Sequence, residues 1–158
     1  MKPNSTTATQ SSSRWSATFN GGILFLLMLT GFAQMPIFKR YYIADIPGLG
    51  WLAQFYVTHF LHYLFAAIFV AIATYKTAEY MLEKKQVWKL SPRGYLMVLT
   101  LFGLIFTGGL LVIRNLSGIY FPASFIIALD IGHLLLVFGL MAGVAYGLFS
   151  KTGWLARR

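Results

Sequence analysis

The chain has three histidines, His59, His62 and His133, and they are its best candidates for chemistry. All three fall inside apolar segments, where an imidazole without a partner is costly. Imidazole nitrogen is a good ligand for iron, and two imidazoles can hold a haem by binding the iron from opposite faces. The positions of the histidines therefore indicate haem ligation as the first hypothesis.

His62 and His133 are expected at the same depth in two different helices. One apolar run begins at about Trp51 and another at about Pro122, and each histidine follows about 11 residues later. At 1.5 Å per residue this is roughly 16 Å from the outer end of each helix. We predict that His62 and His133 are the axial ligands of a haem in the outer half of a membrane. The alternative is that each imidazole only joins two helices by a hydrogen bond, without a cofactor.

His59 stands one helical turn before His62 and is a secondary candidate. It could replace His62 as iron ligand, or bind a haem propionate or a quinone. Arg114 and Asp130, near the outer surface, are candidates for meeting a propionate or carrying a proton, and ordinary interfacial solvation is the alternative for both. Two haems held by histidine pairs would need four histidines, so we expect one haem b. Because the chain has no cysteine, it can hold neither an iron–sulfur cluster nor a thioether-linked haem.

The composition indicates that membrane lipid is the solvent for most of the chain. Hydrophobic residues make up 58% of the 158 residues and charged residues 11%, whereas a soluble domain has about 25% charged residues. The net charge of +9 could suggest nucleic acid, but the basic residues lie in short segments between apolar runs, where membrane topology explains them. We therefore expect no nucleic-acid partner.

The apolar runs predict an all-α integral membrane four-helix bundle over residues 19–150. The expected spans are about 19–38, 51–75, 95–113 and 122–149, each near the roughly 20 residues that a crossing needs. A Ser/Thr-rich segment, residues 1–18, is expected as a flexible tail, and residues 151–158 as a basic C-terminal tail.

The distribution of Lys and Arg predicts the orientation of this bundle. The first tail, the second loop and the C-terminal segment hold 2, 5 and 3 basic residues, against 2 and 1 in the other loops, a ratio of 10 to 3. Basic residues accumulate on the cytoplasmic side. We therefore expect a multi-pass protein of the cytoplasmic (inner) membrane with both termini in the cytoplasm. A ridge in the last span, Gly139, Gly143 and Gly147, would admit another helix or a flat cofactor, and helix packing is the favoured alternative.

Four short segments together resemble one known family. They are THFLHYLFAA from Thr58 to Ala67, GHLL from Gly132 to Leu135, Thr30-Gly31-Phe32 and Thr107-Gly108-Gly109. The first two look like the second-helix and fourth-helix haem segments of the cytochrome b (gamma) subunits of membrane-bound formate dehydrogenases and nickel–iron hydrogenases. The other two are similar to the Thr-Gly pairs at the outer ends of helices one and three in that family. The resemblance spans most of residues 14–149.

The resemblance implies a four-helix, quinone-linked membrane anchor, in which His62 and His133 correspond to the ligands of the haem nearer the outer face. The family normally holds a second haem near the cytoplasmic face, with one histidine early in helix one and another late in helix four. Here no histidine stands early in helix one, and Gly147 stands about 14 residues beyond His133. The chain therefore looks like a reduced, single-haem variant. The family's quinone site lies beside the second haem and is not carried over.

The expected function is that of a haem b membrane subunit in a multi-subunit oxidoreductase. Electrons would pass between an outer-face partner, an iron–sulfur or multihaem cytochrome c subunit, and the membrane quinone pool, with any quinone at a site shared with other subunits. The sequence shows no nucleophile–base pair or carboxylate dyad, so we expect electron transfer and not catalysis by this chain alone. The main alternative is a haem-free membrane anchor or assembly scaffold. A small transporter is a weaker one, because no clear inverted repeat is visible.

Overall fold

The computed structural model describes residues 5–35, 37–150 and 152–157, with side chains from residue 18 onward except Arg157. The chain is mostly helical and divides into two compact units, Met1–Thr77 and Ala78–Arg158. Three of its helices are long and apolar enough to cross a membrane: Phe55–Lys84, Pro92–Ile113 and Ala123–Ser150. These correspond to the second, third and fourth predicted spans. The coarse prediction of a helical, multi-pass membrane protein is therefore confirmed.

The first unit begins with helix α1, Ser5–Ala33. This helix extends into the segment predicted as a flexible tail, since no glycine or proline interrupts the sequence from residue 5 to residue 20; residues 1–4 of the predicted tail lie outside the described part. It also ends before the predicted limit at residue 38. The sequence has a proline at position 36, and helices usually end before a proline. Its apolar part, Thr18–Ala33, is shorter than the other candidate spans, so the first predicted span stays a prediction.

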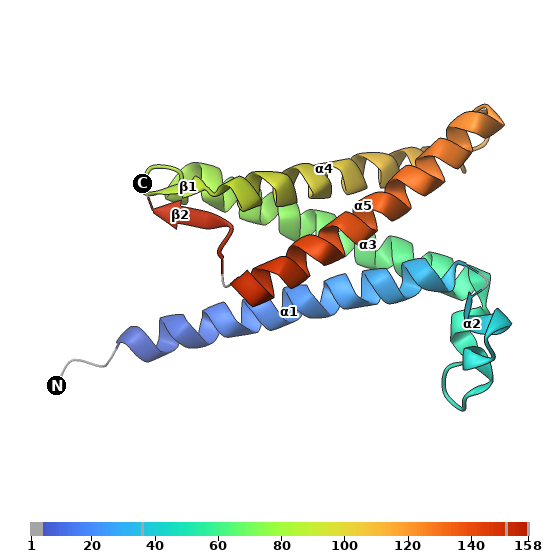
Figure 1. The fold of residues 1–158 in the computed structure, drawn as a ribbon, viewed down its shortest axis with the longest axis horizontal. Coiled ribbons are helices and arrows are strands. Elements are labelled where there is room, and N and C mark those ends of the chain that lie inside the picture. Colours follow the sequence, from blue (N-terminus) through green and yellow to red (C-terminus); the bar gives the residue numbers. More distant parts are fainter. Residues whose placement is uncertain (1–4, 36, 151, 158) are drawn as a thin grey trace. The chain divides into compact units, whose positions relative to one another are not determined.

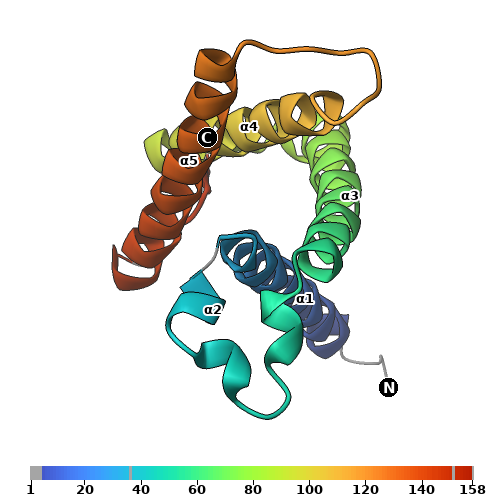
Figure 2. The same ribbon diagram turned by 90° about the vertical axis from the view of Figure 1, so that its right-hand side faces the viewer.

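A compact connection of short helices joins α1 to α3, as the cyan segment in Figure 2 shows. Its elements are α2 (Ile37–Arg40), η1 (Ile43–Asp45) and η2 (Gly50–Ala53). Between η1 and η2 the chain turns at Gly48, whose φ of 90° is readily adopted only by glycine. Helix α3 then runs from Phe55 to Glu79, so it begins four residues later than the predicted span. Because of this later start, His62 lies about two turns into its helix.

The second unit contains η3, α4, α5 and two short strands. The π-helix η3 (Tyr80–Lys84) leads through β1 (Trp88–Leu90) to α4, Pro92–Ile113. The side chain of Ser91 caps α4 by accepting a hydrogen bond from the Gly94 N–H at 3.0 Å, and Pro92 occupies the first turn, where it needs no N–H partner. Helix α5, Ala123–Ser150, returns antiparallel to α4 and lies beside it (Figure 1).

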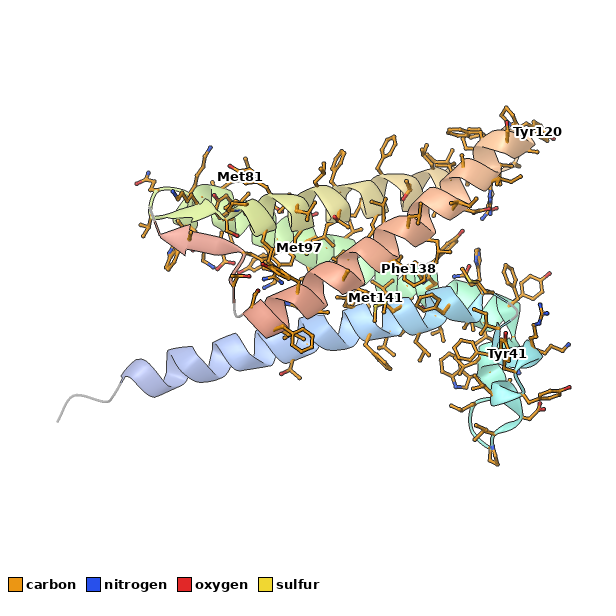
Figure 3. All side chains as sticks on the ribbon, in the orientation of Figure 1. Tyr41, Met81, Met97, Tyr120, Phe138 and Met141 are labelled. Carbon is orange, nitrogen blue, oxygen red and sulfur yellow. The ribbon has the colours of Figure 1, made fainter. Side chains whose placement is uncertain are left out.

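Side chains of α4 pack against two of the three glycines in the ridge of α5, Gly143 and Gly147. Met97 of α4 is 1% exposed and lies between the two helices (Figure 3). A methyl group at Gly143 would lie 2.7 Å from its sulfur atom, and one at Gly147 would overlap the guanidinium of Arg93. Gly139 of the same ridge has open space around it. For Gly143 and Gly147, therefore, the helix-packing alternative is confirmed, and small residues allow the close approach.

The C-terminal segment forms a strand that the sequence analysis does not predict. Strand β2 (Leu155–Arg157) pairs antiparallel with β1, with Leu90 opposite Leu155. The N–H of Ser91 donates to the carbonyl of Trp154 at 2.9 Å, and its hydroxyl donates to the carbonyl of Gly153 at 2.9 Å. This part of the predicted basic tail is thus tied to the start of α4. Residues 151 and 158 of the predicted tail lie outside the described part.

Candidate functional site

His62 of α3 is held by a threonine from α1. The hydroxyl oxygen of Thr30 lies 3.1 Å from Nδ1 of His62 and 2.7 Å from the carbonyl oxygen of Leu26, one turn earlier in its own helix. Thr30 is completely buried, with 0% of its surface exposed. The threonine therefore orients the imidazole of His62 from a site without solvent access.

A glycine beside this threonine makes room for the imidazole ring. A methyl group built on Gly31 would lie 3.2 Å from Cε1 of His62, which is closer than an ordinary van der Waals contact. The missing side chain at position 31 lets the Cε1–Nδ1 edge of the ring come close to α1, where Nδ1 reaches Thr30. The pair Thr30-Gly31 is thus a seat for one edge of the imidazole ring.

His133 of α5 has the same surroundings in the second unit. The hydroxyl oxygen of Thr107 in α4 lies 2.8 Å from Nδ1 of His133 and 2.7 Å from the carbonyl oxygen of Gly103. A methyl group on Gly108 would lie 3.4 Å from Cε1 of His133. A Thr-Gly pair on one helix and a histidine on its neighbour therefore occur twice in this chain, once in each unit. Both Thr-Gly pairs are visible in the sequence, but their contact with the histidines was not predicted.

His59 contacts α1 one turn further along. Its Nδ1 lies 2.9 Å from Oε1 of Gln34, a carbonyl oxygen that can only accept, so Nδ1 donates this hydrogen bond. The ring stacks on Phe55 with centroids 5.1 Å apart and lies 4.3 Å from the centroid of Tyr63. His59 is therefore a fixed imidazole with aromatic neighbours on both sides. Its expected role as an alternative iron ligand, a propionate partner or a quinone partner stays a prediction.

Arg114 forms an ion pair with Asp130 at the C-terminal end of α4. Its Nη1 atom lies 3.2 Å from Oδ2 and 3.3 Å from Oδ1 of the carboxylate. Both side chains are partly exposed, so the pair contributes little to stability. Asp130 stands one turn before His133 in α5. The pair is thus close in sequence to the second histidine, and the expected contact of Arg114 with a propionate stays a prediction.

A basic side chain of α4, Arg93, packs against the C-terminal part of α5. Arg93 donates from Nη2 to the carbonyl of Gly143 at 2.9 Å and from Nε to the same oxygen at 3.3 Å, and its Nη1 donates to the carbonyl of Thr152. The guanidinium lies against Gly147, where a methyl group could not fit. Arg93 of α4 thus packs against the C-terminal end of α5. Its positive charge is favourable there, because the carbonyl groups at the end of a helix carry partial negative charge.

Within the part of the chain that the structure describes, no group of three or more His, Cys, Asp or Glu residues gathers to hold a bare metal ion.

Comparison of the chain with protein-family models, with curated proteins and with solved structures finds no match in any of the three. The fold and the site together define a helical membrane protein of the multi-pass class, with two histidines each seated on a Thr-Gly pair.

Proposed function

We propose that this chain is a haem b subunit of a multi-subunit membrane oxidoreductase, and that His62 and His133 are the axial ligands of its haem. The observation that carries the proposal is the repeated arrangement in which His62 and His133, on two apolar helices, are each held at Nδ1 by a buried or half-buried threonine. Histidines that ligate metals almost always make such a bond with their second ring nitrogen. Two equivalent half-sites suit a cofactor that takes one imidazole on each face.

The donor set fits a haem. Both candidate ligands are imidazoles on apolar helices, and the adjacent glycines leave their Cε1 edges uncrowded. The cofactor, when bound, supplies a one-electron iron couple. The chain supplies the two nitrogen ligands, their orientation through Thr30 and Thr107, and an apolar environment that keeps water from the site. With His62 and His133 assigned, the histidine count limits the chain to one haem of this kind.

The contact of His59 favours the reduced quinol form of a quinone over a propionate as its partner. Since Nδ1 donates to Gln34, the lone pair of neutral His59 is on Nε2. A lone pair accepts a hydrogen bond, which suits the hydroxyl of a quinol, whereas a propionate carboxylate needs a donor. Phe55 and Tyr63 add flat apolar surface next to the imidazole. We therefore place the quinol-binding residue of the proposed function at His59.

The remaining expectations belong to this proposal as well. The Lys and Arg distribution supports an orientation with both termini in the cytoplasm of a cell whose inner membrane holds the chain. The apolar part of α1, Thr18–Ala33, would cross the membrane as well and complete the four spans of the bundle. The family resemblance supports an iron–sulfur or multihaem cytochrome c subunit as outer-face partner and the quinone pool as the other. In this proposal the chain transfers electrons and leaves substrate chemistry to its partners.

A reduced-minus-oxidised optical spectrum of the purified chain or complex, with pyridine haemochrome quantitation, tests the proposal. We expect b-type bands and one haem per chain. The variants His62→Ala and His133→Ala should each lose the bands, and the control His59→Ala should keep them. Absence of b-type bands in the wild type would establish the rival function, a haem-free anchor in which the Thr–His bonds only join helices. Loss of haem in His59→Ala alone would move the ligand assignment to His59.

A further inference from the structure

We propose that Thr30 and Thr107 are positioning residues that fix the tautomer of His62 and His133, so that each imidazole carries its proton on Nδ1 and its lone pair on Nε2. The inference deepens the proposed function, because it names the nitrogen through which each histidine would bind iron. It concerns a property of the chain alone, so it can be tested without haem.

The hydrogen bonds of the threonines determine the position of each imidazole proton. A hydroxyl has one hydrogen. The oxygen of Thr30 lies 2.7 Å from the carbonyl oxygen of Leu26, and two oxygens come so close only with a hydrogen between them. A carbonyl has no hydrogen to give, so the hydroxyl donates to Leu26. The hydrogen between Thr30 and His62 must then come from Nδ1 of the imidazole.

The same reasoning applies independently to the second unit. The oxygen of Thr107 lies 2.7 Å from the carbonyl oxygen of Gly103, so its hydrogen is directed there. Its lone pair faces Nδ1 of His133 at 2.8 Å, and Nδ1 is therefore the donor. Because two different helix pairs give the same proton position, the arrangement does not depend on one local contact.

The chain of hydrogen bonds also strengthens Nε2 as a ligand. Each runs from imidazole N–H to hydroxyl to backbone carbonyl, and successive bonds polarise one another. An imidazole that donates a strong bond from Nδ1 has more electron density on Nε2, so it binds a metal more tightly. A threonine without this role would make the bond to its own helix and leave the tautomer of any histidine unaffected.

Such a threonine is present in the chain and provides a matched control. Thr100 lies on α4, seven residues before Thr107, and is 8% exposed. Its hydroxyl donates to the carbonyl of Leu96 at 2.9 Å, as Thr107 does to its own helix. Among the described side chains no histidine bonds to it. The substitution Thr100→Val therefore removes a buried hydroxyl and its bond to the helix without touching the proposed function of the other two threonines.

Nitrogen-15 NMR of the full chain without haem, labelled at histidine and held in detergent micelles at mildly alkaline pH, measures the tautomers directly. A ring nitrogen with a proton and one without resonate far apart, and the three histidines can be assigned with single His→Gln variants. In the wild type we expect the proton of His62 and His133 on Nδ1. The variant Thr30→Val should increase the fraction of His62 that carries its proton on Nε2. Thr107→Val should have the same effect on His133. Each Thr→Ser variant should restore the wild-type tautomer, and Thr100→Val should not change it.

Haem titration of the same samples gives a second readout. We expect each valine variant to weaken haem binding by about 10–100-fold, the usual effect of removing a group that orients a metal ligand, and Thr100→Val to leave it unchanged. A proton on Nε2 in the wild type, or valine variants that keep the proton on Nδ1, would overturn the inference. If a valine variant does not fold, the wild-type spectrum alone still shows whether the proton of each histidine is on Nδ1 or on Nε2. A wild type with both protons on Nδ1 that binds no haem would support the inference and refute the proposed function.

Discussion

Replacing Gly147 by alanine tests whether the arginine seated on α5 stabilises the helix pair. The added methyl group would overlap the guanidinium of Arg93, which has to leave its position against the helix. The bonds from Arg93 to the carbonyls of Gly143 and Thr152 are then lost or weakened. Gly139→Ala is the matched control, because its methyl group enters open space on the same helix.

The two substitutions should change the free energy of unfolding in opposite directions. Alanine in place of glycine within a helix is worth about 0.5–1 kcal/mol, so Gly139→Ala should be stabilising. At Gly147 the same gain is opposed by the loss of a hydrogen-bonded charge, about 1.5–3 kcal/mol. Since Arg93 is only half-buried, we expect a net loss of about 1–2 kcal/mol at this position.

Far-UV circular dichroism during titration of mixed micelles with SDS measures this free energy. A double-mutant cycle separates the guanidinium contact from the effect of alanine itself. In the background Arg93→Ala, the change Gly147→Ala should become as stabilising as Gly139→Ala. The reasoning fails if Gly147→Ala is as stable as Gly139→Ala in the wild-type background, or if removing Arg93 leaves the effect of Gly147→Ala unchanged.

Three further outcomes are expected. Gly31→Ala should lower the haem content measured as pyridine haemochrome, because its methyl group would press on His62 at 3.2 Å. Gly108→Ala, whose methyl group would lie 3.4 Å from His133, should bind haem as the wild type does. A larger loss of haem in Gly108→Ala than in Gly31→Ala would contradict the placement of the two rings. Ser91→Ala should destabilise the second unit by about 1 kcal/mol and speed amide exchange in the first turn of α4, since the capping bond is lost; unchanged exchange there would count against the cap. Asp130→Asn should alter thermal stability by less than about 1 kcal/mol, because both side chains of its ion pair with Arg114 are partly exposed; a larger loss would mean that the pair supports the fold.

Apolar runs predicted the long helices because they are a local property of the sequence. The predicted end of the third span at residue 113 is the end of α4, and α5 begins and ends within one residue of the fourth predicted span. The beginning of α3 was predicted too early, since the apolar residues from Trp51 to Ala53 form a short 3-10 helix instead. Hydrophobicity alone does not distinguish the two conformations.

The contacts between elements were beyond what the sequence could predict. Thr30 and His62 are 32 residues apart, and whether they meet depends on the register of two helices. The pairing of β1 with β2 likewise joins distant segments, and three-residue strands have no detectable alternation. The histidines themselves were found because an imidazole in an apolar helix is rare, whereas the threonines that hold them are of a common type and give no such signal.

The repeated seat of Thr, Gly and His has a consequence for protein design. It needs only three residues on two adjacent helices, and it occurs here with connections as different as the one between α1 and α3 and the one between α4 and α5. A half-site that tolerates such different loops is transferable. Under the proposed function, a helical hairpin engineered with Thr-Gly on one arm and His on the other would offer one haem ligand whose proton is on Nδ1. Two identical hairpins placed side by side would then present two such imidazoles, one for each face of a haem.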